Sequence, residues 1–284
     1  MILVTGACGK SGQAVIQALV QAGEMVRAFV HRDNQVSLVK SIGASEQIIG
    51  KMEDEFRFRQ ATDGVKAIYH ICSNMNQNEF EIGQTAIAAA RESGASRFVY
   101  HSVLHPQTER MPHHWQKLRV EELLFESGLE FTILQPAPYM QNILSGWHSI
   151  IDQGLFQIPY AGKTRISTVD LEDIAEIAAK ILIDTGHIGA TYEFAGPQPL
   201  SQIEVAEILE NKISRKVRVE QVSLVDWERN ARATGLDEYK IESLLKMFRY
   251  YDQFDFCGNP KVLECLLKRP ATDFEQFVER IISQ

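Results

Sequence analysis

The stretch Ile2-Leu3-Val4-Thr5-Gly6-Ala7-Cys8-Gly9-Lys10-Ser11-Gly12 decides the fold. Its first residues form a short apolar run that predicts a buried strand, and apolar residues at helical spacing predict a helix over 11–22. Gly6 permits a tight turn, Gly9 lets the backbone approach a pyrophosphate, and Gly12 lets the helix pack closely on the strand. The amides at the start of the helix are therefore expected to bind the phosphates of a dinucleotide.

The end of the second predicted strand, over 25–30, distinguishes between the two nicotinamide cofactors. It is followed by His31-Arg32-Asp33. Arg32 is placed to meet the 2′-phosphate of NADP, because a guanidinium forks onto phosphate oxygens. Asp33 could instead bond the ribose 2′-hydroxyl of NAD if the strand ends one residue later, and a loop arginine is often only a solvated charge. We expect NADP(H) in preference to NAD, with NAD left open.

Strand-like and helix-like segments alternate as far as Pro136, joined by short loops. This alternation predicts a parallel sheet with right-handed crossovers, which is a doubly wound α/β (Rossmann) fold. The predicted strands cover 2–4, 25–30, 48–49, 67–72, 97–102 and 131–134, and the predicted helices cover 11–22, 36–42, 85–92 and 116–126.

Prolines and glycines after Pro136 break the alternation and indicate a change of domain. We predict an NAD(P)-binding domain over 1–136 plus about 165–195, which regains a helix at 171–183 and a strand at 191–194. A smaller, mostly helical substrate-binding or lid domain is predicted over about 137–164 plus 196–284. One of its helices starts after Ser201, where Glu204 completes the spacing of a capping box.

Composition excludes several other classes of protein. The 284 residues carry a net charge of −8 at pH 7 without a basic stripe, so nucleic acid is not an expected partner. The apolar runs are far shorter than the roughly 20 residues that span a bilayer, and an apolar strand rather than a basic signal region follows Met1. We therefore expect a cytoplasmic protein with no membrane partner. Its four cysteines match no zinc spacing and are expected to be reduced thiols: Cys8, Cys72, Cys257 and Cys265.

Several short motifs together resemble one family over nearly the whole chain, namely the NmrA-like, atypical branch of the short-chain dehydrogenase/reductase superfamily. That branch includes NADPH-dependent quinone oxidoreductases, triphenylmethane dye reductases and isoflavone-type reductases. It also includes regulators that bind the dinucleotide without turning it over. The motifs are Thr5-Gly6-Ala7 in a Gly-x-x-Gly-x-x-Gly turn, Val30-His31-Arg32, Ser102, Lys117 with Glu121, Phe131-Thr132-Ile133-Leu134-Gln135-Pro136, Tyr139, Asn142, Asp170, Asp173-Ile174-Ala175 and Ala195-Gly196-Pro197.

The resemblance implies three catalytic positions, and the sequence departs from the superfamily at one of them. The superfamily reduces carbonyls with a Ser, a Tyr and a Lys four residues after the Tyr. Ser102 and Lys117 fit the Ser and Lys positions, but His113 stands where the Tyr belongs. His113 could supply a proton, since histidine ordinarily titrates near neutrality, or it could simply contact solvent or a loop carbonyl. Acceptors that delocalise the incoming electrons, such as quinones, ask less of an acid, which favours a small conjugated acceptor.

Further residues are predicted to contact the ligands. The loop after the fourth strand, at Cys72-Ser73-Asn74, lies where ligands meet the carboxyl edge of such a sheet. By resemblance, Lys117 would contact the nicotinamide ribose, while Tyr139 and Asn142 would face the nicotinamide and the substrate. No metal site is expected, because no carboxylate or thiol joins the histidines near 101–114 at ligand spacing. The predicted cofactor-binding residues are Gly6, Cys8, Gly9, Lys10, Ser11, Gly12, Arg32, Cys72, Ser73 and Lys117.

Two functional hypotheses follow from these residues. The first is an NAD(P)H-dependent oxidoreductase acting on a small conjugated acceptor, and the second is a redox-sensing regulator that binds NAD(P) and a protein partner. The missing Tyr favours the regulator. An aromatic set near the C-terminus could wall an apolar substrate cleft, form part of a core or support a homodimer. This aromatic set is Phe248, Tyr250, Tyr251, Phe254 and Phe256.

Overall fold

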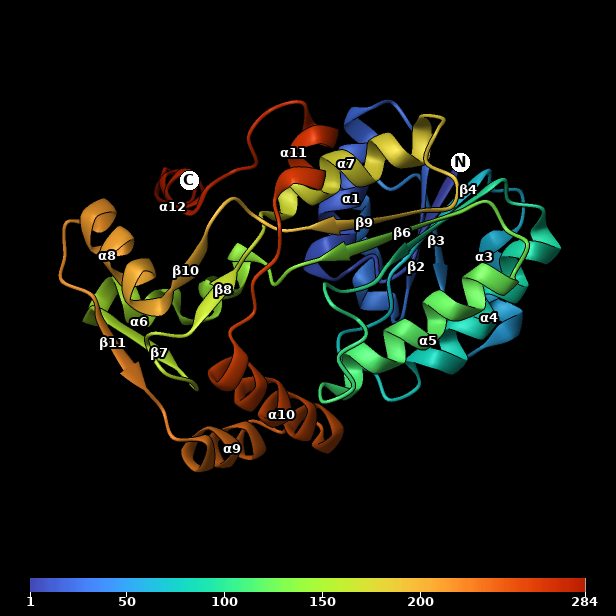
Figure 1. Ribbon diagram of the computed structural model, residues 1–284. Coiled ribbons are helices and arrows are strands. Elements are labelled where there is room, and N and C mark those ends of the chain that lie inside the picture. Colours follow the sequence, from blue (N-terminus) through green and yellow to red (C-terminus); the bar gives the residue numbers. More distant parts are fainter. Residues whose placement is uncertain (284) are drawn as a thin grey trace. The chain divides into compact units, whose positions relative to one another are not determined.

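Strands and helices alternate through the first half of the computed structural model, which describes residues 1–283 (Figure 1). The strands are β1 (Ile2–Val4), β2 (Val26–Val30), β3 (Glu46–Ile49), β4 (Ala67–His70), β5 (Arg97–His101) and β6 (Phe131–Pro136). The helices are α1 (Lys10–Gln21), α2 (Val36–Ser41), α3 (Glu55–Thr62), α4 (Glu79–Ser93) and α5 (Pro112–Glu126), with a 3-10 turn, η1 (Asp33–Gln35), before α2. Because β1 and β4 are buried along their whole length, both are apolar at nearly every position.

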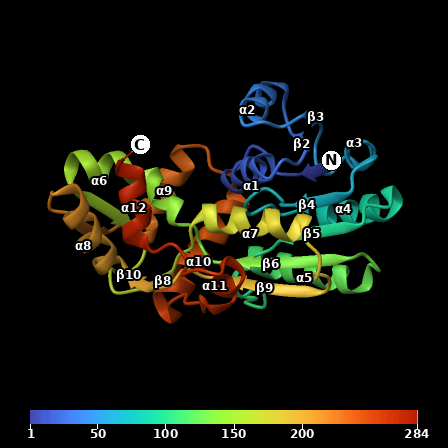
Figure 2. The same cartoon turned by 90° about the horizontal axis from the view of Figure 1, so that it is seen from above.

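Seven strands form one sheet in the order β3-β2-β1-β4-β5-β6-β9, in which β9 (Ala190–Phe194) comes from later in the chain. The pairs from β3 through β6 are all parallel. α1 lies beside α7 (Leu171–Ile183) on one face of the sheet, and α3, α4 and α5 cover the other (Figures 1 and 2). The predicted doubly wound α/β fold is therefore confirmed. The strand order reverses between β1 and β4, which is where such sheets bind ligands at their carboxyl ends.

Some element bounds differ from the prediction for identifiable reasons. α3 was not predicted, since it is mostly charged and polar, although Asp54 caps it by accepting from the Arg57 amide. α5 begins at Pro112 rather than near residue 116, because proline is tolerated in the first turn, where an N–H has no helical partner. β6 continues through Pro136, which is likewise tolerated because it ends the strand.

The chain divides into two compact units. The larger unit comprises Met1–Gln107, His113–Gln135 and Leu171–Tyr192, and holds most of the seven-stranded sheet. The smaller unit comprises Thr108–Pro112, Pro136–Asp170 and the chain from Glu193 onward. Its elements are η2 (Met140–Gly146), α6 (Trp147–Gln153), β7 (Leu155–Ile158), β8 (Arg165–Ser167), β10 (Pro199–Ser201), α8 (Gln202–Ile213), β11 (Arg218–Gln221), α9 (Leu224–Ala233), α10 (Glu238–Phe254), α11 (Lys261–Leu267) and α12 (Phe274–Ile282).

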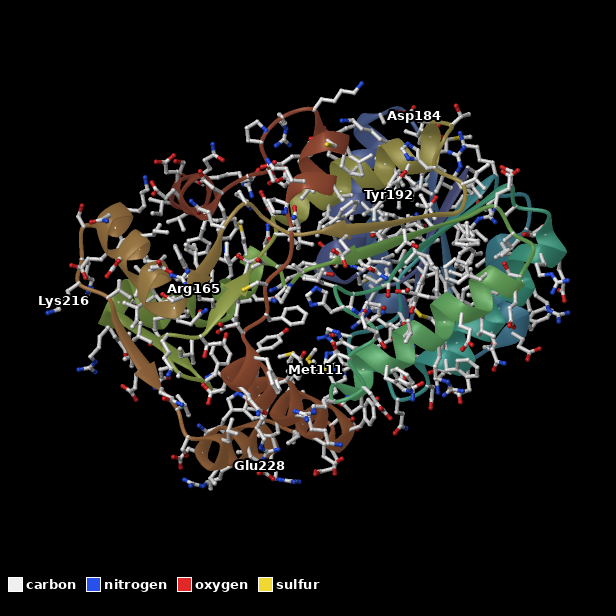
Figure 3. All side chains as sticks on the ribbon, viewed as in Figure 1. Met111, Arg165, Asp184, Tyr192, Lys216 and Glu228 are labelled. Carbon is white, nitrogen blue, oxygen red and sulfur yellow. The ribbon has the colours of Figure 1, made fainter. Side chains whose placement is uncertain are left out.

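Two small sheets organise the smaller unit alongside its helices. β8 pairs with β10 in antiparallel fashion, and β7 pairs with β11 in parallel. Arg165 of β8, labelled in Figure 3, donates to the Pro199 carbonyl at 2.6 Å and to Glu204 at 2.8 Å, which ties β8 to β10 and α8. The predicted capping box is confirmed, since Ser201 accepts from the Glu204 amide and Glu204 accepts from the Ser201 amide.

The aromatic set contributes mostly to the core of the smaller unit. Phe248, Tyr251 and Phe256 are buried. Tyr251 and Phe256 stack with ring centroids 4.8 Å apart. Phe254 is exposed, and the guanidinium of Arg110 lies 5.3 Å from the centre of its ring. Across residues 1–283, no helix has both the length and the apolar character needed to cross a membrane.

Candidate functional site

The glycine turn between β1 and α1 admits no larger residue at two of its three glycines. Gly6 has φ +56°, and a Cβ there would lie 2.7 Å from the carbonyl oxygen of Ile71. A Cβ at Gly12 would lie 2.3 Å from the carbonyl oxygen of Gly6, so α1 packs directly on the turn. A Cβ at Gly9 would meet the same oxygen at 3.3 Å, and the Gly9 amide donates to it at 2.9 Å. The turn is therefore folded tightly over the end of β1.

The first turn of α1 presents backbone amides and no acidic side chain. Gly9 occupies the N-cap position, so no capping side chain covers the N–H groups that follow it. The amide of Gln13 closes the first helical hydrogen bond onto Gly9 at 2.9 Å, and its side chain donates to the Cys8 carbonyl at 2.8 Å. Lys10 is exposed, while Ser11 is 5 % exposed. The positive end of the helix dipole and these amides are the features that an anion-binding site requires.

The loop after β2 is shaped by a residue that sequence reasoning missed. The side-chain oxygen of Gln35 accepts from the amides of His31 and Arg32, at 2.9 and 3.0 Å. The Cys8 sulfur lies 4.0 Å from the Gln35 carbonyl oxygen, so the structure brings this loop beside the glycine turn. Arg32 and Asp33 are both exposed, and Asp33 opens η1. The sequence contains a signal for Gln35. This residue stands three positions after Arg32, the N-cap of η1, which is the spacing of a capping box.

The ends of β1 and β4 are joined through Thr5, directly before the glycine turn. The Thr5 hydroxyl donates to the Ile71 carbonyl and accepts from the Ile71 amide, both at 3.0 Å. It also lies 3.0 Å from Nδ1 of His70. Cys72, which follows Ile71, is buried. Ser73 is exposed, and its hydroxyl accepts a hydrogen bond from the Asn76 side chain at 2.9 Å.

Lys117 lies at the carboxyl end of β5 in contact with a buried acid. Its ammonium donates to Glu79 Oε1 at 2.9 Å and to the carbonyl oxygen of His101 at 3.3 Å. The Tyr100 hydroxyl donates to the same Glu79 oxygen at 2.9 Å. Glu79 gave no signal in the sequence, since its partner is distant along the chain and its helix was predicted to begin at residue 85.

Ser102 follows β5 and forms a second buried polar group with Glu121 and Gln135. The Ser102 hydroxyl donates to Glu121 Oε1, and the Gln135 amide donates to both oxygens of Glu121, at 3.0 and 2.9 Å. Burial raises the pKa of Glu121, while these hydrogen bonds partly offset that shift. The Ser102 proton is therefore directed at Glu121, and its oxygen can still accept a hydrogen bond.

His113 is buried on α5, with 8 % of its surface exposed. Burial, together with the nearby His114 and Lys117, lowers its pKa to about 2. The expectation that His113 titrates near neutrality is therefore wrong for the folded chain, because burial disfavours the charged imidazolium. A neutral imidazole can donate one N–H hydrogen bond but carries no additional proton. Its Nδ1 contacts no hydrogen-bond partner among residues 1–283.

The two predicted substrate residues belong to the smaller unit. Tyr139 is partly buried, precedes η2 and forms a parallel bridge with Val169. Asn142 lies within η2 and is exposed, and its amide donates to the Tyr139 carbonyl at 3.0 Å. The larger unit brings the glycine turn, Cys72, Ser102 and Lys117 together at the carboxyl ends of β1, β4 and β5. In the described part of the chain, no three His, Cys, Asp or Glu side chains are grouped as metal ligands would be.

Residues 1–278 match the model of the NmrA-like family. The chain belongs to this family. Its curated NmrA-like relatives include quinone oxidoreductase 2 of Escherichia coli, which is 25% identical over 291 residues and covers 100% of this chain and 99% of its own length. The NAD(P)H azoreductase of Xenophilus azovorans is 26% identical, with 98% of this chain and 97% of the relative covered.

Solved structures share the fold of this NmrA-like chain. The NADPH-dependent quinone oxidoreductase of Escherichia coli, complexed with NADPH, superposes with a TM-score of 0.85 at 24% identity, covering 99% of this chain and 100% of that one. The Citrobacter sp. triphenylmethane reductase complexed with NADP(H) gives a TM-score of 0.85 at 22% identity, with 99% of both chains covered. Both likenesses extend across the two units.

Proposed function

We propose that this NmrA-like chain is an NAD(P)H-dependent reductase that prefers NADPH and reduces a small conjugated acceptor. The observation that carries the proposal is the glycine turn: Gly6 and Gly12 have no room for a side chain, and the amides of an N-terminus capped by Gly9 lie next to them. Such a cradle fits the pyrophosphate of a dinucleotide. The relatives named for NADPH or NAD(P)H support the same cofactor. When bound, the reduced nicotinamide supplies the hydride.

Arg32 is the proposed determinant of cofactor preference. It is exposed and lies two residues beyond β2, in a loop whose amides are held by Gln35. A 2′-phosphate would form a charge-assisted pair with its guanidinium. Asp33, also exposed, is the residue that would instead accept from the ribose 2′-hydroxyl of NAD.

The side chains of the larger unit that could donate a proton to the acceptor favour a conjugated acceptor. Ser102 directs its proton to Glu121, and Tyr100 directs its proton to Glu79. His113 is neutral, with its pKa lowered to about 2 by burial. Reduction of an ordinary ketone leaves an alkoxide that needs an acid in place. A quinone becomes a stabilised hydroquinone anion and a cationic dye is neutralised, so neither requires a strong acid at this site.

The second candidate is a redox-sensing regulator that binds NAD(P) without turnover. The observation that favours it is His113, which replaces the Tyr of the superfamily and is buried in its neutral form. Under this hypothesis the glycine turn and Lys117 would still hold the dinucleotide.

Calorimetry with NADPH and NADH, followed by turnover assays, distinguishes the two candidates. We expect tight NADPH binding and oxidation of NADPH in the presence of at least one quinone or cationic dye, with turnover lost in Lys117→Ala. Arg32→Ala should weaken NADPH binding about 10- to 100-fold and leave NADH binding nearly unchanged, because a charged hydrogen-bond pair is lost. Lys40→Ala, which removes another exposed cation from the neighbouring α2, is the matched control. Binding without oxidation of any acceptor would favour the regulator, and absence of binding would refute both.

A further inference from the structure

The ion pair between Lys117 and Glu79 is almost fully withdrawn from water. The Lys117 side chain is 13% exposed and the Glu79 side chain 3%. Taking two charges out of water is costly, and the cost is recovered only where good geometry and further hydrogen bonds accompany the pair. A buried ion pair of this kind therefore contributes little to stability by itself. A role in fixing the position of the Lys117 charge explains the pair better.

Glu79 is held from three sides. It lies in the first turn of α4, where the helix dipole stabilises a carboxylate. The Tyr100 hydroxyl donates to its Oε1 at 2.9 Å, and the Cys72 thiol also hydrogen-bonds to it. Burial, reinforced by the charge of Glu79, raises the pKa of both Tyr100 and Cys72 well above their ordinary values. Both groups therefore keep their protons, which makes them permanent donors to the carboxylate.

The other carboxylate near Lys117 is already engaged. Glu121 lies one helical turn further along α5, but its oxygens accept from Ser102 and Gln135. The neighbouring His101 is neutral, since burial first and Lys117 second lower its pKa to about 3. The carboxylate in direct contact with the Lys117 ammonium is therefore that of Glu79.

The number of hydrogen bonds that the Lys117 ammonium can donate is limited. A lysine ammonium has three N–H donors, and here two of them point to Glu79 Oε1 and the His101 carbonyl. Their directions determine the third. We propose that Glu79 is a positioning residue, which fixes the Lys117 ammonium so that its third N–H is presented to the ribose of a nicotinamide nucleotide. This inference rests on the proposed function, in which Lys117 contacts that ribose.

A pair of ligands separates positioning from a general structural role. NADPH carries the nicotinamide ribose, whereas adenosine 2′,5′-bisphosphate carries only the adenosine half, which the glycine turn and Arg32 would hold. We expect Glu79→Gln to raise the Kd for NADPH about tenfold and to change the Kd for adenosine 2′,5′-bisphosphate less than about twofold. Glu79→Asp, which keeps the charge, should restore part of the loss. Glu81→Gln removes an exposed acid from the same helical turn and should change neither Kd.

A double-mutant cycle tests whether Glu79 acts through Lys117. In a Lys117→Met background, Glu79→Gln should cause no further loss of NADPH affinity, because the group that it positions is gone. If the Glu79→Gln variant does not fold, Tyr100→Phe provides a second test, because it keeps the ion pair and removes one hydrogen-bond donor to Glu79. Tyr100→Phe should raise the Kd for NADPH about threefold and leave the Kd for adenosine 2′,5′-bisphosphate unchanged.

The outcomes that would overturn the inference differ from those that would overturn the proposed function. Equal losses for the two ligands would show a structural role only, and additive losses in the cycle would show that Glu79 does not act through Lys117. Unchanged NADPH affinity in Glu79→Gln would refute the inference and leave the cofactor proposal standing. A wild-type chain that binds neither ligand would refute both.

Discussion

Acid should unfold the larger unit over a narrow pH range, because it buries four histidines in their neutral form. Burial lowers the pKa of His70 and His101 from 6.5 to about 3, that of His113 to about 2 and that of His114 to about 4. Above pH 6.5 both the folded and the unfolded chain hold these side chains neutral. As the pH falls below 6.5, only the unfolded chain takes up protons, so folding stability falls with pH.

The magnitude follows from the size of the shifts. Protonation of the unfolded chain at about pH 5 lowers the free energy of unfolding by roughly 2 kcal/mol for each of the four histidines. The total loss is about 8 kcal/mol. A typical domain is stabilised by about 5–15 kcal/mol, so this loss is comparable to the whole free energy of unfolding.

Urea unfolding at about pH 7 and about pH 5 measures this loss. Trp115 reports on the larger unit once the other two tryptophans, Trp147 and Trp227 of the smaller unit, are replaced by Phe. His70→Asn should reduce the difference in unfolding free energy between the two pH values by about 2 kcal/mol, whatever it costs in packing. Ile68→Val, on the same strand, should cost about 1 kcal/mol equally at both pH values. An unchanged pH difference in His70→Asn would refute the reasoning.

Three further predictions concern single contacts. Gly12→Ala should abolish NADPH binding measured by calorimetry, because the added Cβ would lie 2.3 Å from the Gly6 carbonyl oxygen, and retained affinity would contradict the proposed cradle. Ser201→Ala should destabilise the smaller unit by about 1 kcal/mol in urea unfolding, through loss of the capping box, with Ser283→Ala as a control outside any N-cap. Arg280→Met should lower unfolding stability by about 3 kcal/mol, because it removes the guanidinium 2.7 Å from the fully buried Asp170, and a loss below about 1 kcal/mol would argue against this pair.

Features with a local cause could be predicted from the sequence. The turn after β1 was predictable because its glycines stand between an apolar run and a helical pattern. Helix α7 was predicted over the residues that form it, since its apolar positions repeat at helical spacing without interruption. The capping box at Ser201 and Glu204 also depends on residues only three apart.

Features that depend on distant residues could not be predicted in this way. Glu79 and Lys117 meet only because α4 and α5 cover the same face of the sheet, and nothing in the residues around Glu79 signals a partner. The pKa of His113 depends on burial, which one sequence does not give. α3 is held by Phe58 and Ala61 packing into the core, although most of its residues are polar or charged. In each case tertiary packing rather than local preference decides the outcome.

The hydrogen bonds of Thr5 to both backbone groups of Ile71 have a kinetic consequence. They hold the ends of β1 and β4 together directly before the glycine turn, and Gly6 closes against the same residue. We therefore expect a phosphate to bind the amides of this turn without a prior backbone rearrangement. Stopped-flow mixing should accordingly give a single binding phase whose observed rate rises linearly with ligand concentration, without the plateau that a slow isomerisation would impose.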